Sequence, residues 1–337
     1  MRVGANPAKS QTGLGGYGLH RIIVPVYIPH LEGYFEHAIE VLRLCLESLR
    51  ITASKKAAIT VVSNGCAPVA VEELKRLEWI DQLILNQQNR GKIDAAVTAA
   101  RGSYEPLVTI TDCDVLFRDG WIEAVEEVFQ TFPECGYVCP FPSPAGAWHH
   151  TSATLLGALA RAELGYEKVV DNADLDRFAH SIGRLDLYKP EHRNAQLIVR
   201  RQGRIACIGA GHFTCTLRRE VLAGMPGEPS LKAIEGQSEL RWLDLPPDAM
   251  GFWRLSTPRA WVHHMGNIPE PWMHEELAAL LEQGVADADG ARDLPPARLR
   301  WMGKIPVTIR RKIARLLEVT RLIGNDLNTK VQRVEGS

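Results

Sequence analysis

The sequence predicts an α/β fold in which a doubly wound, mostly parallel sheet is flanked by helices and followed by a helical C-terminal extension. Strand-like and helix-like segments alternate between residues 21 and 130. The first strand is a continuous run of β-branched residues, and a basic stretch with apolar residues at helical spacing lies near the C-terminus. Chains that alternate strand and helix in this way build parallel sheets, because each helix returns the chain to start the next strand.

The segment Arg21 to Tyr27 (RIIVPVY) is a continuous run of mostly β-branched residues, which is typical of a strand buried on both faces. Residues 34–50 place apolar side chains three and four positions apart, so they are predicted to form a helix with one core-facing stripe. The same alternation then continues along the chain. It predicts strand 57–63, helix 69–77, strand 83–85, helix 91–101, strand 107–111 (LVTIT) and a helix that begins near Trp121.

The chain is less regular after Pro133. Residues 140–150 (PFPSPAGAWHH) have the composition of a long connection. The other segments are predicted as strand 137–140, helix 152–165, strand 205–217 and strand 261–265, the last of which would close the sheet.

The C-terminal residues 299–331 interleave lysine and arginine with isoleucine and leucine, and past Pro306 they are predicted to form a basic, partly amphipathic helix. Such a helix either lies on an anionic membrane surface or docks a partner, or it packs on its own domain. The predicted organisation is therefore a flexible tail at 1–20, a domain at 21–270 and a helical extension at 271–337. Within the domain, 21–130 is expected to bind a nucleotide and 131–270 an acceptor.

Composition excludes several classes of protein. The formal net charge of -1 provides no field for polyanions, so a nucleic-acid partner is not expected. The seven cysteines form no CxxC pair and show no zinc-ligand spacing, and we expect them to be reduced and mostly buried. The first twenty residues have no apolar run, which predicts a cytoplasmic protein without a signal peptide.

Two carboxylates, Asp112 and Asp114, follow directly after the buried strand LVTIT, with Cys113 between them. In open α/β sheets, ligands bind at the carboxyl ends of the parallel strands. Hard cations such as Mg²⁺ or Mn²⁺ take oxygen ligands and are often held by one or two carboxylates together with substrate phosphates. The alternative is that the triplet is a solvated turn or a helix cap.

Other polar residues follow the neighbouring strands. Arg90 and Lys92 lie at the start of the predicted helix 91–101, where a cation and a helix N-terminus together favour phosphate. The turns after the first two strands, at residues 25–27 and 63–65, are candidates for a base and ribose pocket. An ordinary capped surface helix and core packing of Tyr27 are the alternatives.

Four segments in this order and spacing, VPVY, VVSNG, NRGKIDAAVTAARG and VTITDCDVLF, resemble the inverting family 2 glycosyltransferases with the GT-A fold. The resemblance covers residues 20–130 well and continues weakly to 267. It implies that Asp112 contacts ribose or the metal, that Asp114 is a metal ligand, and that His264 in AWVHHMGN contacts the metal or the diphosphate. The nucleotide contacts that it implies are Pro25, Val26, Tyr27, Asn64 and Asp112. Arg90, Lys92 and Cys113 complete the predicted set of nucleotide-binding residues.

The family's general base usually comes from an acidic pair, and here Gly236 and Gln237 stand at that place in IEGQSELRW. Inverting transfer needs a carboxylate that takes the proton of the acceptor hydroxyl. Glu235 and Glu239 are therefore both candidates, with Glu235 preferred, although both are also compatible with surface charges on a helix. The identity of the nucleobase in the donor stays open, because Ser63 and Asn64 stand where the family often has an aspartate that pairs with uracil.

We therefore expect an enzyme, a hexosyltransferase that uses Mn²⁺ or Mg²⁺ to move a sugar from a nucleotide-sugar donor to a carbohydrate or glycolipid acceptor, in the synthesis of surface polysaccharide or glycoconjugates. It would be cytoplasmic, with peripheral contact at the inner face of the membrane through the basic C-terminal helix. The alternatives are a sugar-phosphate nucleotidyltransferase and a noncatalytic nucleotide-sugar-binding protein of the same fold.

Overall fold

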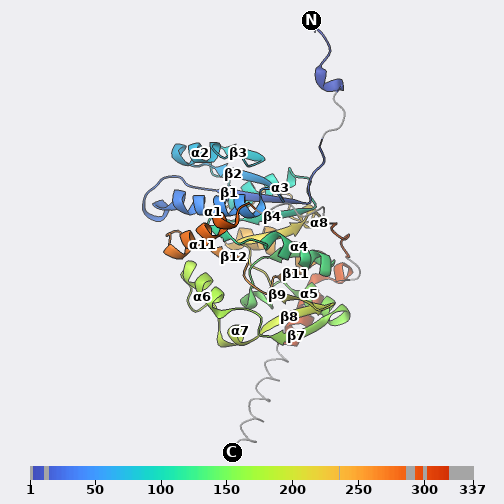
Figure 1. The fold of residues 1–337 in the computed structure, drawn as a ribbon. Helices are drawn as coiled ribbons and strands as arrows, with labels where there is room; N and C mark the ends of the chain where they lie inside the picture. The colour runs from blue at the N-terminus through green and yellow to red at the C-terminus, as the bar shows by residue number, and fades with distance from the viewer. Residues whose placement is uncertain (1–2, 11–14, 235, 286–292, 299–301, 319–337) are drawn as a thin grey trace, which may run out of the picture.

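The computed structural model describes residues 3–10, 15–234, 236–285, 293–298 and 302–318. These residues build a ten-stranded sheet in the order β3-β2-β1-β4-β10-β6-β11-β9-β8-β7 and a two-stranded sheet, β12-β5 (Figure 1). The strands are β1 (His20–Val26), β2 (Ala58–Asn64), β3 (Gln82–Asn86), β4 (Leu107–Thr111), β5 (Val115–Phe117), β6 (Cys135–Cys139), β7 (Glu163–Glu167), β8 (Gln196–Arg201), β9 (Arg204–Ile208), β10 (Thr214–Arg218), β11 (Trp253–Ser256) and β12 (Val262–His264).

Helices connect and cover these strands. They are α1 (Ala38–Ala53), α2 (Pro68–Lys75), α3 (Lys92–Arg101), α4 (Trp121–Thr131), α5 (Ser152–Arg161), α6 (Asn172–Ser181), α7 (Pro190–Asn194), α8 (Arg219–Ala223), α9 (Gly236–Glu239), α10 (Leu245–Met250) and α11 (Pro271–Gln283). Short 3₁₀ turns are η1 (Pro7–Ser10), η2 (Gly33–Phe35), η3 (Pro144–Gly146) and η5 (Met302–Lys304), and η4 (Leu240–Asp244) is a π-helical turn between α9 and α10.

The large sheet is mostly parallel. Strands β3, β2, β1 and β4 pair in parallel, β10 runs antiparallel between β4 and β6, and β11 continues parallel to β6. Since β9, β8 and β7 then alternate in direction, strands β3, β2, β1, β4, β6, β11 and β8 share one direction and only β10, β9 and β7 oppose it. The carboxyl ends of β1, β2 and β4 therefore meet at one edge, as the α/β prediction requires.

The core lies between this sheet and its helices. All five residues of β4 are buried, and β1 is buried along its length except at Arg21. Helix α3 packs on β1 and β2, α1 on β5 and α11, and α4 on β6 and β11. The predominance of apolar and β-branched residues in these strands is explained by this two-sided burial.

Three predictions for the second half were wrong in whole or in part. Residues 205–217 form two strands rather than one, because the chain turns at Gly209, whose φ of 100° and close approach to the backbone of residues 146–147 need a residue without a Cβ. Residues 262–264 do not close the main sheet. They pair with β5, which leaves the plane of the sheet after β4 and offers its own edge.

The helix predicted at 152–165 ends at Arg161, and Glu163–Glu167 form the edge strand β7 instead. All seven cysteines are unpaired, and Cys45, Cys135, Cys139, Cys207 and Cys215 are buried. This agrees with the expectation of reduced, mostly buried thiols.

Residues 307–318 are helical, and the rest of the predicted C-terminal helix lies outside the described residues. The guanidinium of Arg310 is fully buried, donates to the backbone oxygens of Asp248 and Ala249 at 2.6 and 3.0 Å, and lies 3.5 Å from the Asp248 carboxylate. This part of the basic segment therefore packs on its own domain. Within the described ranges, no helix combines the length and apolarity that crossing a membrane requires.

Candidate functional site

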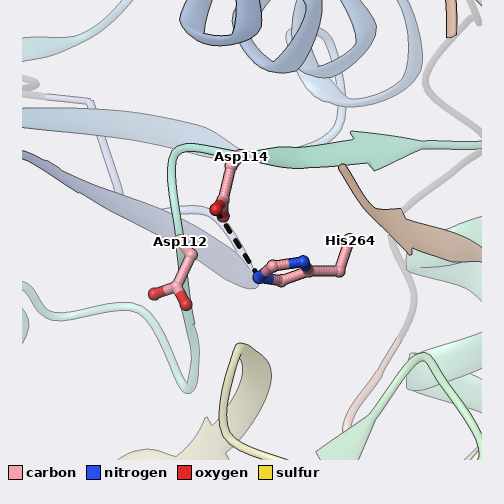
Figure 2. A group of neighbouring side chains, drawn as sticks. All are labelled: Asp112, Asp114 and His264. Carbon is pink, nitrogen blue, oxygen red and sulfur yellow. Dashed lines mark ion pairs between the residues drawn. The ribbon is translucent and has the colours of Figure 1, made fainter. Parts of the chain in front are cut away.

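The chain turns sharply at Asp112–Asp114, between the end of β4 and the start of β5, at the carboxyl edge of the sheet. The amide of Asp112 donates to the Phe213 carbonyl at 2.7 Å, which ties the turn to the start of β10. The amide of Met265 donates to the Asp114 carbonyl at 2.8 Å, which brings the end of β12 beside the turn. As a result, His264 projects toward the two carboxylates (Figure 2).

Asp112, Asp114 and His264 each place a potential ligand atom so that the three atoms lie within 4.8 Å of one another. His264 Nε2 is 3.5 Å from Asp114 Oδ2. The other oxygen, Asp114 Oδ1, is buried and has no hydrogen-bond partner in the part of the chain that the structure describes. A buried carboxylate oxygen without a partner is costly unless a cation or water satisfies it, so these residues fit a divalent cation.

The second ring nitrogen of His264 faces a serine. Nδ1 lies 3.0 Å from Ser181 Oγ at the end of α6, and that hydroxyl donates its own proton to the Phe178 carbonyl at 2.8 Å. A hydroxyl that donates to the Phe178 carbonyl is free to accept from Nδ1, and a neutral ring that donates through Nδ1 leaves the lone pair of Nε2 available to a cation beside Asp114. This orientation by an outer partner is the usual arrangement for a metal-binding histidine.

The preceding histidine, His263, points to the opposite side of β12. Its side chain is 1% exposed, and Nε2 lies 3.2 Å from Arg177 Nη1. Burial, together with the charges of Arg118 and Arg177, lowers the pKa of His263 to about 3. This ring is therefore a neutral packing residue, and only His264 lies beside the aspartates.

Lys92, at the start of α3, joins the aspartate turn to a glutamate. Its Nζ lies 2.6 Å from Asp112 Oδ1 and also contacts Glu239 Oε1. Burial alone would lower the pKa of Lys92, but the charges of Asp112 and Glu239 raise it. Burial likewise raises the pKa of Asp112, with Asp114 adding to the rise and Lys92 opposing it.

The backbone at Gly91 sets the position of Lys92. Gly91 has a φ of 86°, and a Cβ there would lie 1.9 Å from the carbonyl oxygen of Lys232. The amide of Lys92 donates to the Ala233 carbonyl at 3.1 Å. The start of α3 therefore packs directly against the segment that leads into α9, and only glycine permits that approach.

Asn64 is 1% exposed, and its side chain is fully engaged with the β3–α3 loop. Its amide nitrogen donates to Asn89 Oδ1 and the Gly91 carbonyl at 3.0 and 3.3 Å. Its oxygen accepts from Asn86 Nδ2 and the Arg90 amide at 3.2 and 3.0 Å. The structure thus gives Asn64 the role of holding this loop in place.

The other residues of the predicted nucleotide pocket differ in exposure. Pro25 and Val26 are buried within β1, so they offer no free side chain at the edge. Tyr27 is 39% exposed and its ring packs edge-on against Phe35. Arg90 is exposed and Cys113 is half-buried beside the carboxylates.

A glycosyl transferase family 2 model matches residues 22–199, which is more than half of the chain. The chain belongs to glycosyl transferase family 2. No curated protein matches the sequence. Among solved structures, the chain is similar to the mannosyltransferase PcManGT from Pyrobaculum calidifontis in complex with GDP-Man and Mn²⁺, at 16% identity and a TM-score of 0.41, with 93% of this chain and 76% of that chain covered. It is also similar to S. aureus TarS 1-349, at 10% identity and a TM-score of 0.42, with 78% and 70% covered.

In this glycosyltransferase, Glu239 reaches the site from the end of α9. Its carboxylate is 13% exposed, with Oε1 on Lys92 and Oε2 3.6 Å from His212 Nε2. Of the two glutamates predicted as candidate bases, the structure brings Glu239 to the site, and Glu235 lies outside the described residues.

The glycosyltransferase site also contains residues that sequence reasoning missed. His212 Nδ1 lies 3.0 Å from Asp244 Oδ2, and Asp244 Oδ1 accepts from Arg254 Nη2 at 2.6 Å. The π-helical turn Leu240–Asp244 begins directly after Glu239 and ends at Asp244, and the carboxylates of these two residues both face His212. No sequence motif marks this set, although π turns often occur at functional sites.

Proposed function

We propose that this protein is a metal-dependent, inverting glycosyltransferase that moves a sugar from a nucleoside diphosphate to a hydroxyl group. One observation carries the proposal. Asp114 Oδ1 is buried without a partner among the described residues, in a cluster with Asp112 and His264 at the carboxyl edge of the sheet. Family membership supports sugar transfer, and the cluster supports the divalent cation, Mn²⁺ or Mg²⁺.

Asp112, Asp114 and His264 would hold the cation. When bound, it supplies positive charge that offsets the negative charge of the diphosphate as the bond to the sugar breaks. The two aspartates are rigidly placed for this role, since the turn is tied to β10 and β12 through its backbone.

Glu239 is proposed as the general base. Its carboxylate takes the proton of the acceptor hydroxyl while that oxygen forms a bond to the anomeric carbon of the sugar. The bond from that carbon to the diphosphate oxygen breaks at the same time, and the nucleoside diphosphate leaves with the electron pair. Because attack and departure occur on opposite sides of the carbon, the configuration inverts. The location of Glu239, one lysine away from Asp112, supports this assignment.

The nucleotide is proposed to bind along the ends of β1 and β2 and the N-terminus of α3. Tyr27 offers an exposed ring for the base, and Arg90 an exposed cation for phosphate. Asn64 contributes indirectly, since it holds the loop that carries Arg90. The amide of Lys92 at the start of α3 donates to the Ala233 carbonyl, so the phosphate contact is assigned to Arg90.

The acceptor is proposed to be a carbohydrate or glycolipid at an anionic membrane surface. The helix at 307–318 buries Arg310 and Ala314 against the domain. Ile309, Ile313 and Leu316, spaced four and three residues apart, are 49%, 40% and 65% exposed and therefore form an apolar stripe on its outer face. Exposed basic residues flank the stripe, a combination that favours anionic lipid.

A liposome co-sedimentation assay tests the membrane proposal. We expect the protein to sediment with vesicles that contain anionic lipid and to remain in the supernatant with neutral vesicles. Replacing Ile309 and Ile313 by aspartate should abolish sedimentation without lowering the melting temperature, because both side chains are exposed. Unchanged sedimentation of this variant would contradict the proposal.

A thermal-shift screen tests the donor site. UDP, GDP, CDP, TDP and ADP are each added with Mn²⁺ and with EDTA. We expect one nucleotide to raise the melting temperature only with metal, because ligand that binds the folded state alone stabilises it. Replacing Asp114 by alanine should remove that shift, whereas replacing the exposed His274, which pairs with Glu40 on another surface, should leave it intact. If a nucleotide binds but no sugar is transferred to any of the acceptors that are tried, the result would favour a noncatalytic protein.

A further inference from the structure

A row of alternating charges runs from the interior of the protein to the proposed base. Arg254 is buried and donates to Asp244 Oδ1 at 2.6 Å and to the Ala210 carbonyl at 3.0 Å. The other oxygen of Asp244 meets His212 Nδ1, and His212 Nε2 faces Glu239 Oε2 at 3.6 Å. Lys92 holds the remaining oxygen of Glu239. Each member of the row is therefore fixed by oppositely charged or polar neighbours on both sides.

The inner pair determines which nitrogen of His212 carries a proton. Although burial alone would raise the pKa of Asp244, Arg254 and His212 hold it below its usual range, so Asp244 is a carboxylate and can only accept. His212 Nδ1 must then donate to it, which turns Nε2 toward Glu239. The segment from Gly209 to His212 is anchored, because Gly211 accepts from the buried Tyr137 hydroxyl at 2.8 Å.

The pKa of His212 depends on all the charged groups around it. Burial lowers its pKa, but the hydrogen bond and charge of Asp244 and the charge of Glu239 raise it overall, against the opposing charge of Lys92. Farther along the row, Arg254 and His150 face Asp244 rather than His212. The imidazolium form is thus favoured by two carboxylates and opposed by one lysine.

We propose that His212, held by Asp244 and Arg254, is a positioning residue that orients the Oε2 oxygen of Glu239 for proton transfer. The inference rests on the proposed function in one respect, that Glu239 is the base. Glu239 lies at the C-terminal end of the four-residue helix α9, which by itself does not fix a long side chain. With Oε1 on Lys92 and Oε2 3.6 Å from His212 Nε2, the carboxylate is held between two cationic groups, and each oxygen keeps a lone pair for the acceptor proton.

Histidine NMR tests the pairing without any substrate. The imidazole signal of His212 is assigned by its loss in His212→Gln, and its titration is then followed in the full-length protein. We expect a midpoint above that of an unperturbed histidine, which Glu239→Gln should lower, because one nearby negative charge is removed. A His212 midpoint that is unaffected by Glu239→Gln would overturn the inference.

Kinetics test the role once the thermal-shift screen has identified a donor. In His212→Gln, we expect kcat to fall at least tenfold, because Oε2 of Glu239 loses the group that orients it. KM for the donor and the metal-dependent thermal shift should be unchanged, since Asp112, Asp114 and His264 remain. His212→Lys, which keeps a cation beside Glu239, should recover part of the lost kcat.

The NMR titration and the kinetic assay test the positioning role of His212 separately from the proposed function. An unchanged kcat in His212→Gln would overturn the positioning role even if the NMR pairing holds. If no nucleotide binds and no transfer occurs, the proposed function fails, and the NMR titration still decides whether His212 and Glu239 form a pair.

Discussion

The hydroxyl of Ser181 offers a sharp test of the metal site, because it touches His264 without touching the cation position. Ser181 Oγ accepts from His264 Nδ1 at 3.0 Å and donates to the Phe178 carbonyl at 2.8 Å. Replacing Ser181 by alanine leaves Nδ1 without this partner and allows the ring to carry its proton on Nε2 instead. In that tautomer the nitrogen that faces Asp114 has no lone pair to offer a cation.

The expected magnitude follows from what else holds the ring. Loss of an outer partner of a metal-binding histidine costs about 10- to 100-fold in metal affinity, or about 1.4 to 2.7 kcal/mol. Phe178 and Phe213 pack edge-on against His264, with ring centroids 5.9 and 5.7 Å away, so the plane of the ring is retained. We therefore expect an effect near the lower limit, about tenfold.

The assay is a titration with Mn²⁺ alone, followed by the EPR signal of the free ion. Ser54→Ala is a matched control, because Ser54 Oγ also donates to a helix carbonyl, that of Arg50 at 2.6 Å, but lies at the end of α1. Both variants should lose about 1 kcal/mol of stability, and only Ser181→Ala should lose Mn²⁺ affinity. Equal Mn²⁺ affinity in wild type and Ser181→Ala would refute the tautomer argument, and equal affinity in Asp114→Ala would remove the cluster as a metal site.

Three further predictions concern stability and catalysis. Replacing the fully buried Arg310 by methionine should lower the free energy of unfolding by about 3 to 5 kcal/mol in urea denaturation, whereas the same change at Arg311, whose side chain is 35% exposed, should cost less than about 1 kcal/mol. Gly91→Ala places a Cβ 1.9 Å from a backbone oxygen, so we expect nucleotide-dependent thermal shifts to disappear, while Gly165→Ala, which meets nothing within 4 Å, should preserve them. Glu239→Gln should reduce kcat by about 10² to 10⁴ with little change in donor KM, and near-normal turnover would exclude this residue as the base.

The order of strands and helices in the first half could be predicted from the sequence. Segments such as LVTIT and RIIVPVY are rich in β-branched and apolar residues on both faces of their strands because both faces are covered, and this signal is local. Once the strands are parallel, their carboxyl ends must share an edge, so the location of Asp112 and Asp114 at that edge also follows from the sequence.

The partners of those carboxylates were decided by tertiary structure. His264 reaches Asp114 because β12 pairs with β5, and the sequence alone suggested that this strand would join the main sheet. Lys92 meets Glu239 across 147 positions of the chain, through the close packing of Gly91 against the segment that precedes α9. Local sequence carries no signal for such a meeting, because it depends on where two distant loops end.

The row of charged residues from Arg254 to Glu239 is the clearest case of contacts that local sequence does not predict. Sequence patterns identify a glutamate or a histidine, but its charge and orientation depend on burial and on neighbours contributed by other elements. His212 comes from the β9–β10 loop, Asp244 from a π turn and Arg254 from β11. The sequence by itself determined the alternation of strands and helices and the position of the aspartate pair. The folded chain decided which side chains form hydrogen bonds and ion pairs with one another, because those contacts are made between segments far apart in the chain.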